Sequence, residues 1–225
     1  MRAKTFTESG RRAQIVTAAI EVIAEVGYAK ASFSRIAKHA GLSSTGMISY
    51  HFAGKDDLLA ACVAEIERVT GAFMQPRIDA ADGHVGQLRA YVESNVALVS
   101  EHRAAIRALI DLVKNAGSQS TAVNERLAVF EEHFRTGQAA GAFRPFDPRT
   151  VAIAFASGLD AVVATAAAAP EPAGPTELAR LGHELAELFV RATAPDPEMG
   201  ACEAFCACPH RSGAGVPQDS EGESR

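Results

Sequence analysis

The sequence predicts an all-α fold in which a short N-terminal group of helices precedes a larger helical domain. Apolar residues recur at intervals of three and four along most of the chain, which is the spacing of one face of an α-helix. We find no alternating pattern of a β-strand, and glycine or proline separates many of the helical segments. With 225 residues, 48% of them hydrophobic and 22% charged, the composition is that of a globular protein with a packed core.

Three predicted helices lie within the first 55 residues. The first follows the apolar stripe of residues 15–26 and ends at Gly27, because glycine favours a left-handed helix end. Ser32 is placed to cap a short second helix over residues 33–39. A third short helix is expected to start near residue 43 or 44 and to run to about residue 50.

The longer helices follow Gly54. The first of them carries Asp56 and Asp57 in its first turn, where carboxylates interact favourably with the helix dipole. Asp147 is placed to cap another helix that begins at Pro148. Apolar stripes predict the remaining helices around residues 88–99, 106–113, 123–134, 148–168 and 176–192.

Charge is distributed unevenly along the chain, although the formal net charge is only −5. Residues 1–55 hold eight Lys or Arg and three acids, a charge of +5, which leaves −10 for residues 56–225. This distribution is expected of a protein whose N-terminal segment binds a polyanion. An ordinary fluctuation over a short segment would give the same count.

The second and third short helices, joined by a turn that contains Gly41, have the shape of a helix-turn-helix. Beyond Met47 and Ile48 the third helix offers few core residues, and small polar residues let a helix lie close to base edges in the major groove. The candidate contacts are Ser43, Ser44, Thr45, Gly46 and Ser49, then the donors Tyr50 and His51 and the cation of Lys55. Taken alone, the segment fits a solvent-exposed surface helix equally well.

The segment over residues 27–59 resembles the DNA-binding region of the TetR family of transcriptional regulators. The shared features are Gly27 after the first helix, the Ile-Ala-x-x-Ala-Gly sequence of residues 36–41, the aromatic-His-Phe sequence of residues 50–52, Lys55, and the leucine pair at 58–59. They cover about the first quarter of the chain. The stretch from Gly41 to Phe52 is one residue longer than is usual in the family, with the extra residue around residues 44–46.

The resemblance implies a DNA-binding transcriptional regulator. It implies a helix-turn-helix DNA-binding domain in residues 1–55 and a helical effector-binding and dimerisation domain in residues 56–195. The regulator would be a repressor whose homodimer binds a pseudo-palindromic operator of double-stranded DNA and is released by a small-molecule effector. Activation is the alternative, because the sign depends on where the operator lies relative to the promoter. The two recognition helices would then lie about 34–36 Å apart, or a multiple of that distance.

The same resemblance assigns roles to individual residues. Tyr50 and His51 would contact phosphate or bases, and Lys55 would anchor a phosphate. Ser32 and Ser34 would bind phosphate at the start of the supporting helix, where Arg35 adds a cation. Phosphate contacts of this kind would make the affinity fall steeply with salt.

The effector is expected to bind among the helices between residues 58 and 140. Asn95 lies on an apolar stripe, so its amide needs a partner, for which a group of the protein is a simpler expectation than a ligand. His102 and Arg103 are expected to form a solvated helix start. Aromatic and methionine side chains at helical spacing more often form a core than a pocket, and with that alternative open the candidate pocket residues are Phe73, Met74, Tyr91, Asn95, Phe130, His133, Phe134 and Phe155.

The last two predicted helices carry surfaces suited to close packing. Small residues between positions 152 and 161 would let two helices approach each other, and leucines between positions 178 and 188 form an apolar stripe. These surfaces would pack within the chain, or, as the resemblance implies, against the same helices of a second copy.

After Pro195 the helical pattern ends, and residues 196–225 are expected to form a disordered tail. The tail contains possible zinc ligands, although their spacing is not a usual one: Cys202, Cys206, Cys208 and His210. A regulator that responds to a metal or to thiol oxidation is therefore one alternative, and a helical interaction module that binds no DNA is another. No cofactor is expected otherwise.

Neither a catalytic set nor a membrane segment is expected from the sequence. We find no nucleophile, base and orienting group that belong together, and no glycine-rich phosphate loop. The longest nearly apolar stretch, residues 161–169, is far shorter than the roughly 20 residues that span a bilayer. The N-terminus lacks the apolar stretch of a signal peptide. We therefore expect a cytoplasmic protein that is not an enzyme.

Overall fold

The structure, a computed structural model, describes residues 6–115 and 119–195 of the chain. In these residues the regular secondary structure is helical throughout, as the sequence predicts, with nine α-helices and one 3₁₀ turn. The described residues belong to one compact unit. The tail, with its three cysteines and His210, lies outside the described residues.

The N-terminal helices, here called the head, are α1 (Phe6–Val26), η1 (Tyr28–Lys30), α2 (Phe33–His39) and α3 (Gly46–His51). Ser32 caps α2 as predicted, since its side-chain oxygen accepts a hydrogen bond from the Arg35 amide. The prediction that α3 starts near residue 43 or 44 is wrong. The end of α2 is closed by the Leu42 amide, which donates to the Ala37 carbonyl, and residues 43–45 are then needed to connect the two helices.

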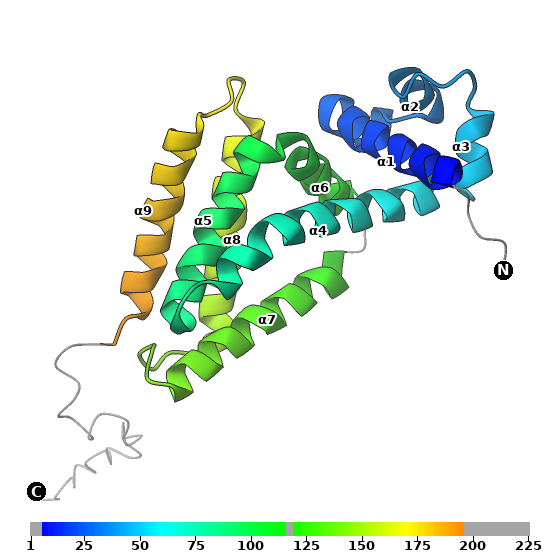
Figure 1. Cartoon of the computed structure of the whole chain (residues 1–225). Coiled ribbons are helices and arrows are strands. Elements are labelled where there is room, and N and C mark those ends of the chain that lie inside the picture. The colour runs from blue at the N-terminus through cyan, green and yellow to red at the C-terminus, as the bar shows by residue number, and fades with distance from the viewer. Residues whose placement is uncertain (1–5, 116–118, 196–225) are drawn as a thin grey trace, which may run out of the picture. The chain divides into compact units, whose positions relative to one another are not determined.

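Six longer helices form the rest, here called the body: α4 (Lys55–Asp79), α5 (Gly83–Glu101), α6 (Arg103–Asn115), α7 (Gln119–Ala139), α8 (Pro148–Ala168) and α9 (Pro175–Thr193). Figure 1 shows α4 leading from the end of α3 into the body, where it meets α5. Helix α9 packs along α5, and α7 packs along α8. Asp147 caps α8 as predicted, because its carboxylate accepts a 2.6 Å hydrogen bond from the Thr150 amide.

Two hydrophobic clusters lie within this unit. The first joins α1, α2 and α3 to the start of α4, and it also takes in Ala108 and Leu112 of α6. The second fills the body around Phe134 and Phe155, which are fully buried. Helix α6 contributes to both clusters through different side chains, so it links the packing of the head to that of the body.

By length and composition alone, α8 could cross a membrane. One of its faces is used in the body core, where Phe155 and Leu159 are buried. Asp160 of the same helix forms an ion pair with Arg126 of α7. The apolar composition of α8 therefore has a structural role in packing the body.

The small residues of α8 divide between two surroundings. Ala152 and Ala156 are buried within the chain. A Cβ atom on Gly158 would lie 3.3 Å from Cζ of Phe189 in α9, so this glycine leaves room for the Phe189 ring. Ser157 and Ala161 face solvent, as does Leu188 of α9, which is 61% exposed. Packing within the chain thus uses only part of the expected surface.

Candidate DNA-binding surface

Helix α3 has one buried face and one exposed face. Ile48 and Phe52 are buried against the head cluster and fix the orientation of the helix. Tyr50 is 75% exposed, an unusual position for a large aromatic side chain, and Ser49 beside it is exposed as well. The structure thus presents polar groups of α3 to solvent from a helix that is held by its apolar face.

The hydroxyls before α3 are also exposed, although most of them lie in the turn. Ser43, Ser44 and Thr45 belong to the connection between α2 and α3, and Gly46 is the first residue of α3. Backbone groups hold the connection to the helix, because the Thr45 carbonyl accepts hydrogen bonds from the amides of residues 48 and 49 at 3.0 and 3.2 Å. Exposed hydroxyls of a connecting turn suit contact with phosphate more than with base edges.

The start of α2 forms a second group of exposed polar residues. Ser34 and Arg35 are exposed, and so is Ser32. Because the Ser32 oxygen accepts the capping hydrogen bond from the Arg35 amide, its own O–H proton stays available to donate. A hydroxyl that caps a helix and donates outward is well suited to a phosphate oxygen.

The cation of Lys55 is held against the head. Its Nζ donates a 3.2 Å hydrogen bond to the Tyr28 carbonyl and lies 4.1 Å from the centre of the Tyr28 ring. An ammonium group has three N–H donors, so this contact leaves two for a phosphate. His51 is half-buried, and its ring packs edge-on against Tyr50 with 5.1 Å between ring centres.

Four cations in the described part of the head contribute to the charge without being predicted contacts: Arg11, Arg12, Lys30 and Lys38. Arg11 donates a hydrogen bond to the side chain of Gln14. Lys30 and Lys38 are exposed. Arg12 of α1 is half-buried, with its guanidinium 4.7 Å from the centre of the Phe52 ring. The +5 charge of residues 1–55 was the available signal, but a charge count does not say which side chains share a face.

The structure brings most of the expected effector-pocket residues together in the body. The rings of Tyr91, Phe130 and Phe155 come from three helices and pack edge-on or tilted, with centres 4.9–6.1 Å apart. Phe134 joins them, 5.8 Å from Phe155. Here they form a tightly packed aromatic cluster.

Asn95 finds partners within the protein, as expected. Its Nδ2 donates to Sδ of Met74 at 3.5 Å, and it also hydrogen-bonds Tyr91. Burial raises the pKa of Tyr91, and the nearby Arg126 partly offsets this effect. Asn95, Met74 and Tyr91 thus form a polar group at the edge of the aromatic cluster.

Phe73 lies outside this aromatic contact set, whereas His133 borders it, with its ring centre 6.0 Å from that of Phe134. Phe73 contacts the ring of His102 and lies under the guanidinium of Arg77, 3.8 Å from the ring centre. His133 is linked through Nε2 to the His84 carbonyl at 3.1 Å. Burial holds the pKa of His133 below its usual value.

The expectation of a solvated start for α6 is wrong for Arg103. Its Nε donates to the Ala167 carbonyl at 3.1 Å, and its Nη2 donates to the Ala169 carbonyl. These are unpaired carbonyls at the end of α8, which a guanidinium is well suited to satisfy. His102 is half-buried against Phe73 rather than solvated.

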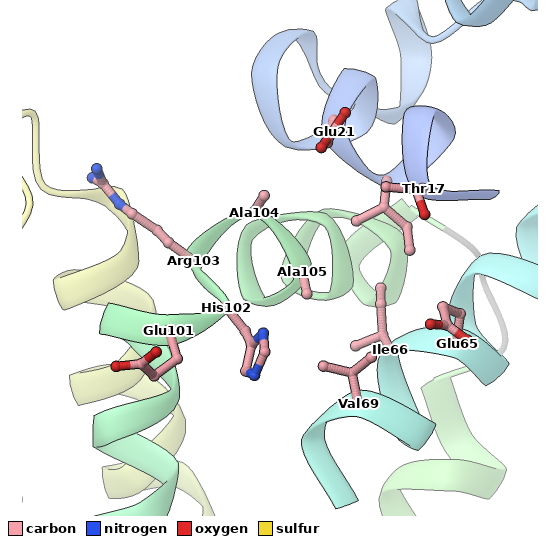
Figure 2. Close-up of a pocket in the computed structure, with 11 residues that line it drawn as sticks. Thr17, Glu21, Glu65, Ile66, Val69, Glu101, His102, Arg103, Ala104 and Ala105 are labelled. Carbon is pink, nitrogen blue, oxygen red and sulfur yellow. The ribbon is translucent and has the colours of Figure 1, made fainter. Parts of the chain in front are cut away.

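Two cavities lie where the head meets the body. The first, of about 240 Å³, lies between α1, α4 and the α5–α6 corner, and Figure 2 shows Glu21, Glu65 and His102 among its lining residues. The second, of about 260 Å³, lies between the end of α1, α6 and the end of α8, and Asp111 lines it. Neither cavity is lined by the expected effector-pocket residues.

Within residues 6–115 and 119–195, no group of three or more His, Cys, Asp or Glu side chains is arranged to hold a metal ion. The candidate zinc ligands of the tail lie outside that part of the chain. Cys62 is buried, and burial raises its pKa to about 12.

Known proteins resemble the N-terminal part of this chain in sequence and most of the described chain in fold. Residues 15–62 match the family described as bacterial regulatory proteins, tetR family. The HTH-type transcriptional regulator BetI of Stenotrophomonas maltophilia (strain R551-3) is 42% identical over 93 residues, which are 41% of this chain and 47% of BetI. The chain thus covers less than half the length of this relative.

Two solved structures share the fold over most of both chains. The fatty acid degradation regulator FadR from Bacillus halodurans superposes with a TM-score of 0.67 at 24% identity, covering 80% of this chain and 94% of FadR. AibR, in complex with isovaleryl coenzyme A and operator DNA, superposes with a TM-score of 0.63 at 20% identity, covering 82% and 98%. Residues 15–62, which include the helix-turn-helix of α2 and α3, thus match the tetR family of bacterial regulatory proteins, and the described helices share the fold of these two solved structures.

Proposed function

We propose that the chain is a repressor that binds operator DNA through α2 and α3 as a homodimer and leaves the operator when its body binds a small molecule. The observation that carries the proposal is the exposure of Tyr50 on a helix anchored by the buried Ile48 and Phe52. The Tyr50 ring contacts the ring of the neighbouring His51 but is not part of the head cluster, so a binding role accounts best for its exposure. A repressor of this kind would act on the chromosome, in the cytoplasm.

Electrostatics support the same surface. The head carries the positive charge of the chain, and the rest carries net negative charge that would repel DNA. Each phosphate contact contributes about 0.9 to the slope of log affinity against log salt. We therefore expect affinity for duplex DNA to fall steeply with salt, and substitution of Lys55 to lower that slope.

Selection of bound duplexes from a random pool tests the proposal. The wild-type protein should enrich a pseudo-palindromic sequence whose half-sites are separated by one or more helical turns. Tyr50→Ala should fail to enrich it, whereas Val129→Ala, at a 66% exposed site on α7, should enrich it normally. A wild-type protein that enriches no sequence at low salt would overturn the proposal.

The second copy would pack on the exposed face of α8 and α9. Ser157, Ala161 and Leu188 are exposed there, and small residues let two helices approach closely. A charge in the centre of such a face would prevent association. Light scattering should report a dimer for the wild type and a monomer for Ala161→Glu, while Val129→Glu stays dimeric; a monomeric wild type would contradict this arrangement.

For the effector, the body offers the polar group of Asn95, Met74 and Tyr91 beside the aromatic cluster. AibR, which shares the fold, forms a complex with isovaleryl coenzyme A and operator DNA, and this supports an acyl ester as the class of effector to test. The proposed effector is a small molecule with a large apolar part, which would enter by moving these side chains apart. Screening acyl-coenzyme A esters and free carboxylic acids for release of the enriched duplex tests it, and Tyr91→Ala should lose the response while keeping duplex affinity.

A further inference from the structure

A single residue of the head, Tyr28, contacts two helices of the body, α4 and α6. Its amide donates a hydrogen bond to Oδ2 of Asp111 in α6. Its carbonyl accepts the 3.2 Å hydrogen bond from Lys55 Nζ at the start of α4, and its ring lies under the same ammonium. Tyr28 thus contacts a carboxylate of α6 through its amide and, through its carbonyl and ring, a cation on the candidate DNA-binding surface.

The backbone at this point is shaped to receive Asp111. Gly27 has a φ of 83°, a conformation that favours glycine, and it turns the chain out of α1. A Cβ atom on Gly27 would lie 3.6 Å from Oδ2 of Asp111, so the carboxylate touches the turn itself. No side chain of the head caps the start of η1, and the carboxylate of α6 fills that role.

The Asp111 carboxylate is itself held in place. Nδ2 of Asn115 donates to its Oδ1 at 3.1 Å, and also to the Asp111 carbonyl at 2.7 Å. With Oδ1 occupied by Asn115, Oδ2 is directed to the Tyr28 amide. The carboxylate therefore has a fixed orientation rather than a freely rotating one.

The other end of α6 is tied to α8 by Arg103. Its guanidinium donates to the carbonyls of Ala167 and Ala169 at the end of α8, and Figure 2 shows it directed away from the first cavity. Eight residues separate Arg103 from Asp111, about 12 Å along a helix. Helix α6 is thus held by side-chain contacts near both of its ends, at the end of α8 and at the Tyr28 turn.

We propose that Asp111 is a positioning residue for DNA binding: it holds the Tyr28 turn and thereby Lys55. The proposal rests on the proposed function for its consequence, because Lys55 is a phosphate contact only if the head binds DNA. It assigns to the body a specific group that sets the DNA-binding geometry of the head.

Operator affinity of variants tests the proposal, with the duplex enriched by the wild-type protein as the probe. Asp111→Ala should weaken binding on the order of tenfold and lower the salt slope by about 0.9 for each protomer, as Lys55→Met does. Glu67→Ala, which removes the same charge from an exposed site on α4, is the control and should keep the wild-type slope. Removing an acid alone would strengthen binding to DNA, so a loss in Asp111→Ala has the opposite sign to a simple charge effect.

The double variant Asp111→Ala/Lys55→Met separates positioning from a general structural role. If Asp111 acts through Lys55, the double variant should bind within about twofold of Lys55→Met. Losses that multiply, or wild-type affinity in Asp111→Ala, would overturn the proposal.

A second variant covers the case in which Asp111→Ala does not fold. Asp111→Asn keeps an oxygen acceptor but can present an amide donor to Tyr28, so hydrogen exchange at the Tyr28 amide should be faster than in the wild type and unchanged in Glu67→Ala. Equal exchange rates in all three proteins would overturn the proposal. This measurement needs no DNA. If the wild type enriched no duplex, the proposed function would be contradicted, and hydrogen exchange would still test the contact between Asp111 and the Tyr28 amide.

Discussion

Two neighbouring aromatic residues of the head should respond to substitution in opposite ways. Tyr50 is 75% exposed on α3, whereas Phe52, two residues later, is 2% exposed in the head cluster. Tyr50→Ala should weaken DNA recognition while leaving the fold intact, and Phe52→Ala should destabilise the fold. The comparison separates a binding residue from a packing residue within one helix end.

The magnitudes follow from burial. Removing a buried phenylalanine ring costs about 3–5 kcal/mol, and loss of the Arg12 guanidinium contact over the ring adds about 0.5–1 kcal/mol. Truncating an exposed side chain changes stability by no more than about 0.5 kcal/mol. Loss of one recognition contact costs about 1–3 kcal/mol of binding free energy in each half-site, roughly tenfold or more in affinity.

Urea denaturation followed by circular dichroism measures the stabilities, and fluorescence anisotropy with the enriched duplex measures the affinities. Tyr50→Phe is the matched control, because it keeps the ring and removes only the hydroxyl. Stability loss in Tyr50→Ala, or wild-type affinity in that variant, would refute the assignment of α3 as the recognition helix.

Three further predictions concern the body and the buried thiol. Gly137→Ala should destabilise the protein by about 1–3 kcal/mol, because its Cβ atom would lie 2.3 Å from the ring of the buried Phe143. Gly71→Ala, in open space on α4, should stabilise the protein by about 0.5–1 kcal/mol. Urea denaturation measures both changes, and equal effects of the two substitutions would contradict the packing of Phe143 on Gly137. The pKa of His133 is lowered by burial, so below about pH 6.5 the unfolded state binds the extra proton, and unfolding free energy should fall from pH 7.5 to 5.5 by more in the wild type than in His133→Gln. With the tail cysteines replaced by serine, Cys62, whose pKa is about 12, should resist a thiol reagent in the native protein and react once in guanidinium; rapid native labelling would argue against its burial.

Local signals predicted the elements well because their causes are short-range. Ser32 and Asp147 cap the helices that the sequence assigned to them, each through an amide three residues ahead. The start of α3 could not be placed in the same way. It depends on how the Leu42 amide closes α2, and the residues that follow would have fitted a helix equally well.

Long-range contacts were the part that sequence reasoning missed. Arg103 was expected in solvent, and it binds carbonyls of α8 that are 64 and 66 residues away. Asp111 was not singled out, because its partner is a backbone amide 83 residues away, which carries no signature in the sequence. For Tyr50, the resemblance proposed a contact, and only the structure gave its exposure.

The sharing of α6 between the two hydrophobic clusters limits how this protein can be recombined with its relatives. A chimera that carried residues 1–55 onto a foreign body would leave behind Ala108 and Leu112, which complete the packing under α1. Helix α1 would then pack against side chains of the foreign body that differ from Ala108 and Leu112. Exchange of operator specificity should therefore succeed only when the graft also carries the side chains of α6 that pack against α1.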